Sequence, residues 1–234
     1  MKSKKSLSVV IPVYNEGASI NKCLKGILNK SPKDIEVIIV YDFNQDSTIP
    51  VINKMNNPSL RLVKNNRGKG VLNAIKTGMA FAKGESVLVT MADISDDPST
   101  IVPMLQRFDE GYDIVCGSRY MKGGKKIGGP KLKSFLSWLA GVSGHYILKI
   151  PTHDLTNSFK LYRKSFLDEI NIESKGGFEL GMEIVLKGHF MGKKITEVPT
   201  IWYDRTSGKS RFKLFSWLPR YIYWYFWGVK KLYE

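Results

Sequence analysis

Residues 7–42 read LSVVIPVYNEGASINKCLKGILNKSPKDIEVIIVYD. Leu7–Val13 and Glu36–Tyr41 are short apolar runs rich in β-branched residues, typical of strands buried on both faces of a parallel sheet. Between them, Ser19–Leu28 carries apolar residues at helical spacing. A strand, a helix and a second strand in this order predict a β–α–β unit with parallel strands.

The same alternation continues to about residue 117 and predicts an α/β fold, Rossmann-like, with a mainly parallel sheet and helices on both faces. We expect further strands at Leu60–Val63, Ser86–Met91 and Tyr112–Gly117, and helices at Ser47–Met55, Gly70–Ala82 and Ser99–Phe108. Ligands of such sheets bind at the carboxyl ends of the strands. Beyond residue 120 the pattern changes, and we expect two helices and an aromatic tail, at Leu132–Leu148, Phe178–Met191 and Phe212–Tyr233.

The chain of 234 residues is long enough for one sizeable domain, and its net charge is +15. Such a charge indicates a polyanionic partner: a nucleotide substrate, an anionic membrane surface or nucleic acid. No nucleic-acid recognition motif is present, so we expect no nucleic-acid partner. The two cysteines, Cys23 and Cys116, exclude a disulfide framework and favour a reducing compartment. The first apolar run is too short for a signal peptide, and no run is long enough for an ordinary membrane span.

Polar residues follow the first two predicted strands. Pro12, Tyr14 and Glu16 end the first strand, and Asp42 follows the second. A carboxylate in this position can accept hydrogen bonds from a ribose hydroxyl or a base N–H, although aspartate is also common in turns. The segment NNRGKG, with Lys69, leads into a helix, where glycines and a cation suit a phosphate or an ordinary surface turn.

The fourth strand ends in MADISDDP, residues 91–98, which places Asp93, Asp96 and Asp97 close together. Clustered carboxylates after a buried strand suit Mg²⁺ or Mn²⁺ holding a diphosphate. The alternative for Asp96 and Asp97 is that they cap the helix that follows. After the fifth strand, Arg119 begins a basic loop that suits phosphate, or is an ordinary solvated loop.

In this order, six segments resemble the inverting family 2 glycosyltransferases of the GT-A fold, and among them the dolichol- or polyprenyl-phosphate glycosyltransferases. The resemblance covers about residues 6–212. It is carried by VVIPVYNE (9–16), the acidic turn after the second strand with Asp42, RGKG (67–70), ADISDDP (92–98), GSRY (117–120) and EVPTIWYDRTSGKSR (197–211).

The resemblance implies a role for each matching residue. It implies catalytic roles for Asp93, Arg119 and Arg205, and it makes Asp93 the metal ligand, for Mg²⁺ or Mn²⁺. It implies that Arg119, Asn157 and Lys160 contact the acceptor phosphate. It also implies that the nucleotide-sugar donor is bound by Pro12, Tyr14, Glu16, Asp42, Lys69, Asp93 and Lys209.

The chain departs from the family pattern at two motifs. Met91 stands where the first aspartate of the DxD-like motif is usual, and Ser95 replaces a glutamine, so metal independence is an open alternative. The family's DxxSGFR-like stretch reads DLTNSFK here, residues 154–160, which keeps Asp154 and replaces an arginine by Lys160. The charge survives this replacement, but the bidentate fork of arginine does not.

The implied reaction moves a sugar, with inversion, from a nucleotide sugar of the GDP-mannose or UDP-glucose type to a dolichyl or polyprenyl phosphate. Residues 1–120 form the nucleotide-sugar half, residues 121–212 the acceptor half, and residues 213–234 an aromatic, basic tail. We expect the tail and the helix near residues 132–148 to lie in a membrane interface, which makes the protein peripheral on the cytoplasmic side. The alternative for the tail is a helix packed on the domain.

Two other functions remain open from the sequence. One is transfer to a soluble hydroxyl acceptor, which needs a general base such as Glu179 or Glu183. The other is a non-catalytic subunit that binds a nucleotide sugar. The oligomeric state is not predicted.

Overall fold

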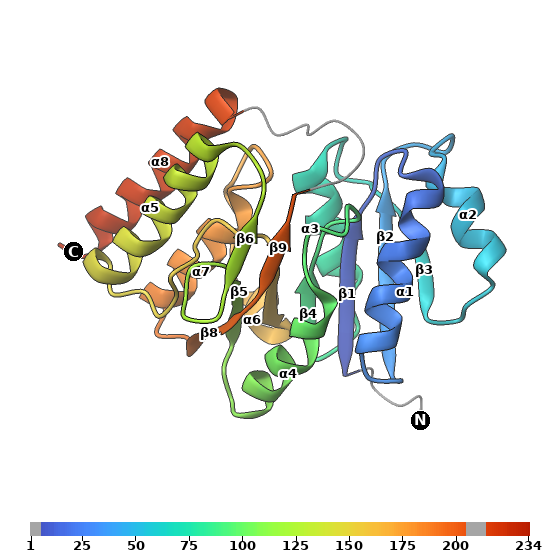
Figure 1. Ribbon diagram of the computed structural model, residues 1–234, viewed down its shortest axis with the longest axis horizontal. Helices are drawn as coiled ribbons and strands as arrows, with labels where there is room; N and C mark the ends of the chain where they lie inside the picture. The colour runs from blue at the N-terminus through green and yellow to red at the C-terminus, as the bar shows by residue number, and fades with distance from the viewer. Residues whose placement is uncertain (1–5, 205–213) are drawn as a thin grey trace.

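The computed structural model describes residues 6–204 and 214–234. Its centre is a seven-stranded sheet in the order β3-β2-β1-β4-β7-β5-β8. The strands are β1 (Leu7–Pro12), β2 (Ile35–Tyr41), β3 (Leu60–Lys64), β4 (Ser86–Val89), β5 (Ile114–Ser118), β7 (Lys160–Arg163) and β8 (Ile195–Pro199). The mainly parallel α/β sheet predicted from the sequence is confirmed (Figure 1).

Only β7 runs against the other strands of this sheet. It pairs antiparallel with both β4 and β5, which places Leu161 opposite Leu88 on one side and Val115 on the other. The segment that precedes β7 therefore enters the sheet at the edge where β4 and β5 end. Sequence analysis did not predict this strand, and the arrangement brings residues 154–159 to the predicted ligand-binding edge.

Helices cover both faces of the sheet, as expected, and alternate side chains along each strand divide the core in two. Val9 and Ile11 face one layer, whereas Val10 faces the other. The first layer contains α1 (Ile20–Lys30), α2 (Thr48–Met55) and α4 (Ile101–Asp109). The second contains α3 (Val71–Phe81), α6 (Lys164–Glu169), α7 (Leu180–Phe190) and α8 (Leu214–Lys231).

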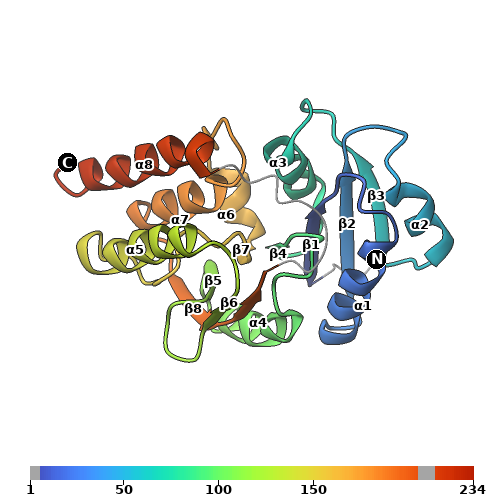
Figure 2. The same cartoon turned by 45° about the horizontal axis from the view of Figure 1, so that its top comes forward.

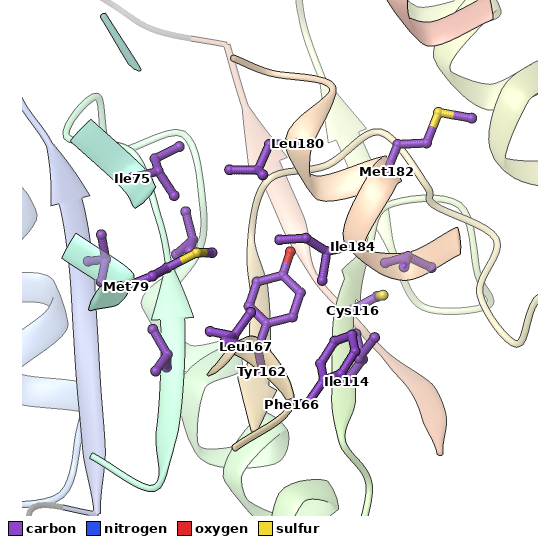
Figure 3. Packing of buried hydrophobic residues seen from close by; sticks show 14 of the residues in the cluster. Ile75, Met79, Ile114, Cys116, Tyr162, Phe166, Leu167, Leu180, Met182 and Ile184 are labelled. Carbon is purple, nitrogen blue, oxygen red and sulfur yellow. The ribbon is translucent and has the colours of Figure 1, made fainter. Parts of the chain in front are cut away.

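The second layer is packed around Tyr162 of β7, which is 1% exposed. Figure 3 shows its ring between Met79 of α3 and Ile184 of α7, with Phe166 and Ile114 below. The antiparallel strand thus joins the half of the sheet that carries α3 to the half that carries α7.

Two elements lie beyond the main sheet, near its ligand-binding edge. A two-stranded parallel sheet is formed by β6 (Lys125–Ile127) and β9 (Ile201–Tyr203). The helix α5 (Lys131–Ile147) lies beside α8 (Figures 1 and 2). This helix packs closely on the segment around His153, since a Cβ added at Gly141 would lie 2.0 Å from the carbonyl oxygen of that residue.

Helices α5 and α8 expose many large apolar side chains. They are Leu132, Phe135, Trp138, Leu139, Tyr146 and Ile147 on α5, and Ile222, Tyr223 and Phe226 on α8. Other aromatic residues of α8 pack inward: Trp224 is 2% exposed and Trp227 contacts Phe190. One side of α8 therefore packs on the domain, as the alternative for the tail predicts, and the other side exposes large apolar side chains. Among the described residues, no helix is long and apolar enough to cross a membrane.

Candidate active site

One large cavity of about 1310 Å³ opens at the carboxyl ends of β1, β2, β4 and β5. Its wall brings together most of the residues that sequence analysis selected: Pro12, Tyr14, Glu16, Asp42, Lys69, Asp93, Arg119 and Asn157. From there the cavity continues between α5 and α8, where its wall is mainly apolar: Leu136, Leu139, Ala140, Leu218, Tyr221, Ile222 and Tyr225. A polar end and an apolar end thus belong to one continuous space.

The ends of β1 and β2 are tied to each other beside the cavity. Asp46 accepts the backbone N–H of Asn15 at 3.0 Å, and Thr48 Oγ1 accepts that of Glu16 at 3.1 Å. The ring of Tyr14 is 44% exposed and meets Phe43 edge-on, with centroids 5.2 Å apart. The turns are therefore fixed while an aromatic face remains accessible, which suits a nucleobase.

Asp42 holds the loop that leads into α3. Its Oδ1 accepts Asn65 Nδ2 at 2.7 Å, and its Oδ2 accepts the backbone N–H of Gly70 at 2.9 Å. Gly70 has φ of +117°, which a side chain would disfavour. This arrangement sets Lys69 on the cavity wall at the N-terminus of a helix, a position that favours an anion.

The turn after β4 carries three aspartates in different environments. Asp97 is the N-cap: its Oδ1 accepts the Ser99 N–H at 2.9 Å and its Oδ2 accepts Ser99 Oγ at 2.7 Å. Asp93 Oδ1 accepts the Ser95 N–H at 3.2 Å and lines the cavity. Asp96 is 8% exposed, and burial together with the nearby Asp93 raises its pKa to about 7. The capping alternative is therefore observed for Asp97 and not for Asp96.

Two buried oxygens of this turn lack a hydrogen-bond partner among the described residues: Ser95 Oγ and Asp96 Oδ1. A buried polar atom left unpaired costs about 1–3 kcal/mol. No group of three or more His, Cys, Asp or Glu within the described residues forms a complete metal site. Nevertheless, hard oxygens from Asp93, Ser95 and Asp96 fit a divalent cation that completes its coordination with a diphosphate.

Arg119, at the end of β5, is paired with Asp154, which lies just before β7. Its Nε donates to Asp154 Oδ2 at 2.6 Å and its Nη2 to Oδ1 at 2.8 Å. Burial pushes the pKa of Asp154 up, but the adjacent guanidinium outweighs it and leaves that pKa below its ordinary value. The ion pair fixes the Arg119 guanidinium in the wall of the cavity.

Hydroxyl groups extend from Arg119 toward α5. Arg119 Nη2 lies 3.0 Å from Ser137 Oγ and 2.9 Å from Thr156 Oγ1, and these two oxygens are hydrogen-bonded to each other. Lys126, from β6, lies over the Trp202 ring at 4.7 Å, and burial followed by the nearby Arg119 lowers its pKa. Ser137, Thr156, Lys126 and Lys133 all line the cavity. Cations and hydroxyls thus meet where its polar and apolar parts join, which suits a phosphate.

Two predicted phosphate contacts are placed differently by the structure. Asn157 lines the cavity, but its Nδ2 donates to the Gly117 carbonyl at 2.9 Å, which ties it to β5. Lys160 is fully buried and does not line the cavity; its ammonium donates to the carbonyl oxygens of Leu155 and Asn157. Lys160 therefore supports the segment that carries Thr156 and Asn157 from below, and direct contact with a phosphate would require rearrangement.

The carboxylates of Glu179 and Glu183 accept hydrogen bonds from the backbone of a nearby loop, so neither is available as a general base for a sugar acceptor. Glu179 accepts the N–H groups of Gly176 and Gly177 at 2.7 and 2.9 Å. Glu183 accepts those of Glu173 and Ser174 at 2.6 and 2.9 Å. Both carboxylates are almost completely buried, so they fix the loop that precedes α7, whose Gly176 and Phe178 line the cavity.

Arg205 and Lys209, predicted catalytic and donor-binding residues, lie outside the described residues. The structure adds Ser137, Thr156, Lys126 and Lys133 to the site. The sequence contained a pattern for Lys126 alone, as part of the basic loop. Ser137 and Thr156 have no distinguishing pattern, because the antiparallel course of β7 brings Thr156 to Arg119 and the packing of α5 brings Ser137 there.

Comparison with known proteins shows that the fold is that of the GT-A glycosyltransferases, and a family match states the relationship more closely. The sequence profile of "Glycosyl transferase family 2" matches residues 8–171. The chain belongs to this family.

Two curated relatives carry informative names. The chain is 30% identical over 224 residues to the dolichol-phosphate mannosyltransferase of Pyrococcus furiosus, covering 93% of this chain and 62% of the relative. It is 31% identical over 211 residues to the undecaprenyl-phosphate mannosyltransferase of Micrococcus luteus, covering 86% and 85%. The chain therefore spans less than two thirds of the length of the Pyrococcus protein.

Solved structures confirm the fold. Glucosyl-3-phosphoglycerate synthase from Mycobacterium tuberculosis, in complex with UDP, matches with a TM-score of 0.70 at 17% identity. That match covers 97% of this chain and 81% of the other. A structure of the same enzyme that holds Mn²⁺, UDP and glucosyl-3-phosphoglycerate matches with a TM-score of 0.65 at 18% identity, covering 99% and 80%.

Proposed function

We propose that this protein transfers a hexose from a nucleotide sugar to a polyprenyl or dolichyl phosphate, at the surface of a membrane. One observation carries the proposal: a single cavity joins the polar ends of the parallel strands to an apolar groove between α5 and α8. A soluble acceptor has no use for such a groove. The names of the Pyrococcus and Micrococcus relatives support the same acceptor class.

The donor occupies the end of the cavity beneath β1, β2 and β4. Tyr14 offers its exposed ring to the base, and Glu16 and Asp42 offer acceptors to the nucleoside. Lys69 and the side chains of the Asp93 turn face the diphosphate. Asp93 would hold Mg²⁺ or Mn²⁺, which when bound would supply positive charge to the leaving diphosphate. Arg205 and Lys209 keep their proposed phosphate roles. The base and the sugar are those of GDP-mannose or UDP-glucose.

The acceptor phosphate lies at the junction of the two parts of the cavity. Its oxygens meet the hydroxyls of Ser137 and Thr156 and the positive charges of Arg119, Lys126 and Lys133. A phosphate oxygen attacks the anomeric carbon, the bond from that carbon to the diphosphate breaks, and the nucleoside diphosphate leaves. One displacement inverts the configuration, so an α-linked donor gives a β-linked product.

This acceptor does not require a general base, because a phosphate monoester is already ionised at neutral pH. The structure is consistent with that chemistry, since Glu179 and Glu183 are each engaged by two backbone N–H groups. We therefore assign them to loop positioning.

The lipid tail follows the apolar groove, and the protein lies on the membrane as a peripheral protein of the cytoplasmic side. Exposed aromatic side chains of α5 and α8, such as Trp138 and Phe226, suit the interfacial region. Exposed Lys131, Lys149, Lys230 and Lys231 belong to or adjoin these helices, and the net charge of +15 favours anionic lipid. In this arrangement, residues 1–120 serve the donor, 121–212 the acceptor and 213–234 the membrane.

A competition between acceptors tests the proposal. Purified protein is given labelled GDP-mannose or UDP-glucose together with a short polyprenyl phosphate, the matching unphosphorylated polyprenol, or phosphoglycerate. We expect label in the organic phase only with the lipid phosphate. Label on phosphoglycerate would support the soluble-acceptor alternative, and no product with any acceptor would support a binding subunit.

A further inference from the structure

The turn after β4 directs three of its polar residues to the wall of the large cavity. Asp93, Ser95 and Asp96 all line the large cavity, and Asp96 also borders a smaller cavity of about 330 Å³ beside α1. Ile94, between the first two, has φ of +61°, which a β-branched residue rarely adopts. The turn therefore holds a conformation that places residues 93, 95 and 96 at the same wall.

Neighbouring aspartates of this turn differ in how their oxygens are used. Both carboxylate oxygens of Asp97 are occupied by Ser99. In Asp96, Oδ2 accepts Thr90 Oγ1 at 3.1 Å, whereas Oδ1 has no partner among the described residues although the side chain is more than nine-tenths buried. Ser95 is 3% exposed, and its hydroxyl is likewise unpaired there. Helix capping explains Asp97, but it does not explain Asp96 or Ser95.

Negative charge gathers here in a strongly basic protein. The pKa of the Cys23 thiol is raised to about 12, first by burial and then by the nearby carboxylates of Asp93, Asp96 and Glu16. These three carboxylates therefore lie close to one thiol. Met91, where the DxD-like motif usually has its first aspartate, offers no oxygen from its side chain. A divalent cation would neutralise the gathered charge and satisfy the unpaired oxygens.

We propose that Asp96, assisted by the Ser95 hydroxyl, supplies the ligand oxygens that Met91 lacks, so that Asp93 and Asp96 together bind Mg²⁺ or Mn²⁺. The inference rests on the proposed function, because the same cation faces the donor diphosphate. It places the second carboxylate three residues after Asp93 instead of two residues before it.

Direct binding of Mn²⁺ tests this assignment without reference to activity. Mn²⁺ is titrated into the full chain, alone and with GDP or UDP, and electron paramagnetic resonance measures the Mn²⁺ that stays free in solution. We expect Asp96→Asn to weaken Mn²⁺ binding at least about tenfold. Loss of a residue that only supports a metal ligand already costs about 10- to 100-fold in affinity, and loss of a direct ligand should cost no less. Ser95→Ala should weaken it less, by about two- to fivefold, because a neutral hydroxyl contributes less than a carboxylate.

Asp97→Asn is the matched control, since it removes a carboxylate from the same turn without touching the cavity oxygens, and its Mn²⁺ affinity should stay within about twofold of the wild type. An affinity of Asp96→Asn equal to that of this control would overturn the proposal. So would a wild-type protein that binds no Mn²⁺ with either nucleotide. Thermal melting in EDTA verifies folding; if Asp96→Asn unfolds, Asp96→Ser keeps an acceptor for Thr90 and should lose Mn²⁺ to the same extent.

The same preparations separate this inference from the proposed function. Lipid product formed equally in Mg²⁺ and EDTA, without Mn²⁺ binding, would overturn the cation site and leave the transferase standing. Mn²⁺ binding that depends on Asp96, without any lipid product, would support the cation site and contradict the transferase.

Discussion

Asp154 holds one edge of the Arg119 guanidinium, with Nε 2.6 Å from Oδ2 and Nη2 2.8 Å from Oδ1. The Asp154 carboxylate also accepts the backbone N–H of Arg119 at 3.0 Å. Because Asp154 already occupies the Nε–Nη2 edge of the guanidinium, we propose that the hydroxyls of Ser137 and Thr156, which contact Nη2, hydrogen-bond to the acceptor phosphate. Arg119 thus provides a fixed charge, and its neighbours provide the hydrogen bonds.

Replacing Asp154 by asparagine should destabilise the protein by about 3–5 kcal/mol, because it leaves the buried Arg119 charge without its partner. Denaturant unfolding monitored by circular dichroism measures the change. The control is Glu110→Gln, which breaks an ion pair with Arg107 at the surface and should leave stability almost unchanged, because solvent screens exposed pairs. Similar losses in the two variants would contradict a structural role for the Asp154 pair.

Stability in EDTA should fall as pH rises from about 4 to about 7, because of Asp96. Its pKa is raised from 3.8 to about 7 in the folded protein, so in this range the folded state binds a proton that the unfolded state has lost. The shift of about 3 units corresponds to about 4 kcal/mol at most. In Asp96→Asn this contribution is absent, so the variant should gain stability relative to wild type through this pH range. If the free energies of unfolding of wild type and Asp96→Asn keep the same difference from pH 4 to pH 7, the raised pKa of the buried Asp96 carboxyl is contradicted.

Filling the apolar groove should weaken binding of the lipid and leave the donor unaffected. Ala140 of α5 lines the cavity, so Ala140→Phe occupies space that the polyprenyl chain needs. We expect the KM for a long polyprenyl phosphate to rise about tenfold, or ~1.4 kcal/mol, with an unchanged KM for the nucleotide sugar. Leu132→Phe adds a ring to the same helix at an exposed position outside the cavity and should change neither constant. Equal effects of both substitutions would place the lipid elsewhere.

Charged residues on the exposed apolar surface should release the protein from membranes. Trp138 and Phe226 are 43% and 64% exposed, so Trp138→Glu with Phe226→Glu removes two side chains that we place in the interface. Loss of about 2 kcal/mol for each buried aromatic side chain predicts at least a tenfold drop in partitioning to anionic vesicles. Val102→Glu, on α4 in the opposite layer and 45% exposed, should co-sediment as the wild type does. Equal partitioning of all three proteins would contradict membrane docking through α5 and α8.

Local sequence predicted the parallel half of the fold closely because β1, β2, β4 and β5 are buried along almost their whole length and therefore read as continuous apolar runs. Predicted Glu36–Tyr41 became β2, Ile35–Tyr41, and predicted Gly70–Ala82 became α3, Val71–Phe81. β7 was missed because its four residues, KLYR, begin and end in a cation and show no apolar run. Its antiparallel place between β4 and β5 follows from long-range pairing, which local periodicity does not report.

The candidate site divides in the same way. Residues that end parallel strands, such as Glu16, Asp42 and Asp93, reach the cavity wall because all these strands end at one edge. Lys160 was predicted from a motif to contact phosphate, yet the register of β7 turns its side chain into the interior. Ser137 comes from α5, and its closeness to Arg119 depends on how that helix packs over residues 153–155. That packing brings together segments that are distant in the sequence, so no local sequence pattern predicts it.

The most direct test of the central claim is the label that wild-type protein and Asp93→Ala move from a nucleotide sugar into the lipid phase, with a polyprenyl phosphate as acceptor. The account predicts organic-extractable label for the wild type and a loss of at least about 100-fold for Asp93→Ala, since Asp93 is placed beside the departing diphosphate. Undiminished transfer by Asp93→Ala would contradict the site. Absence of label in the lipid phase with the wild type would contradict the function.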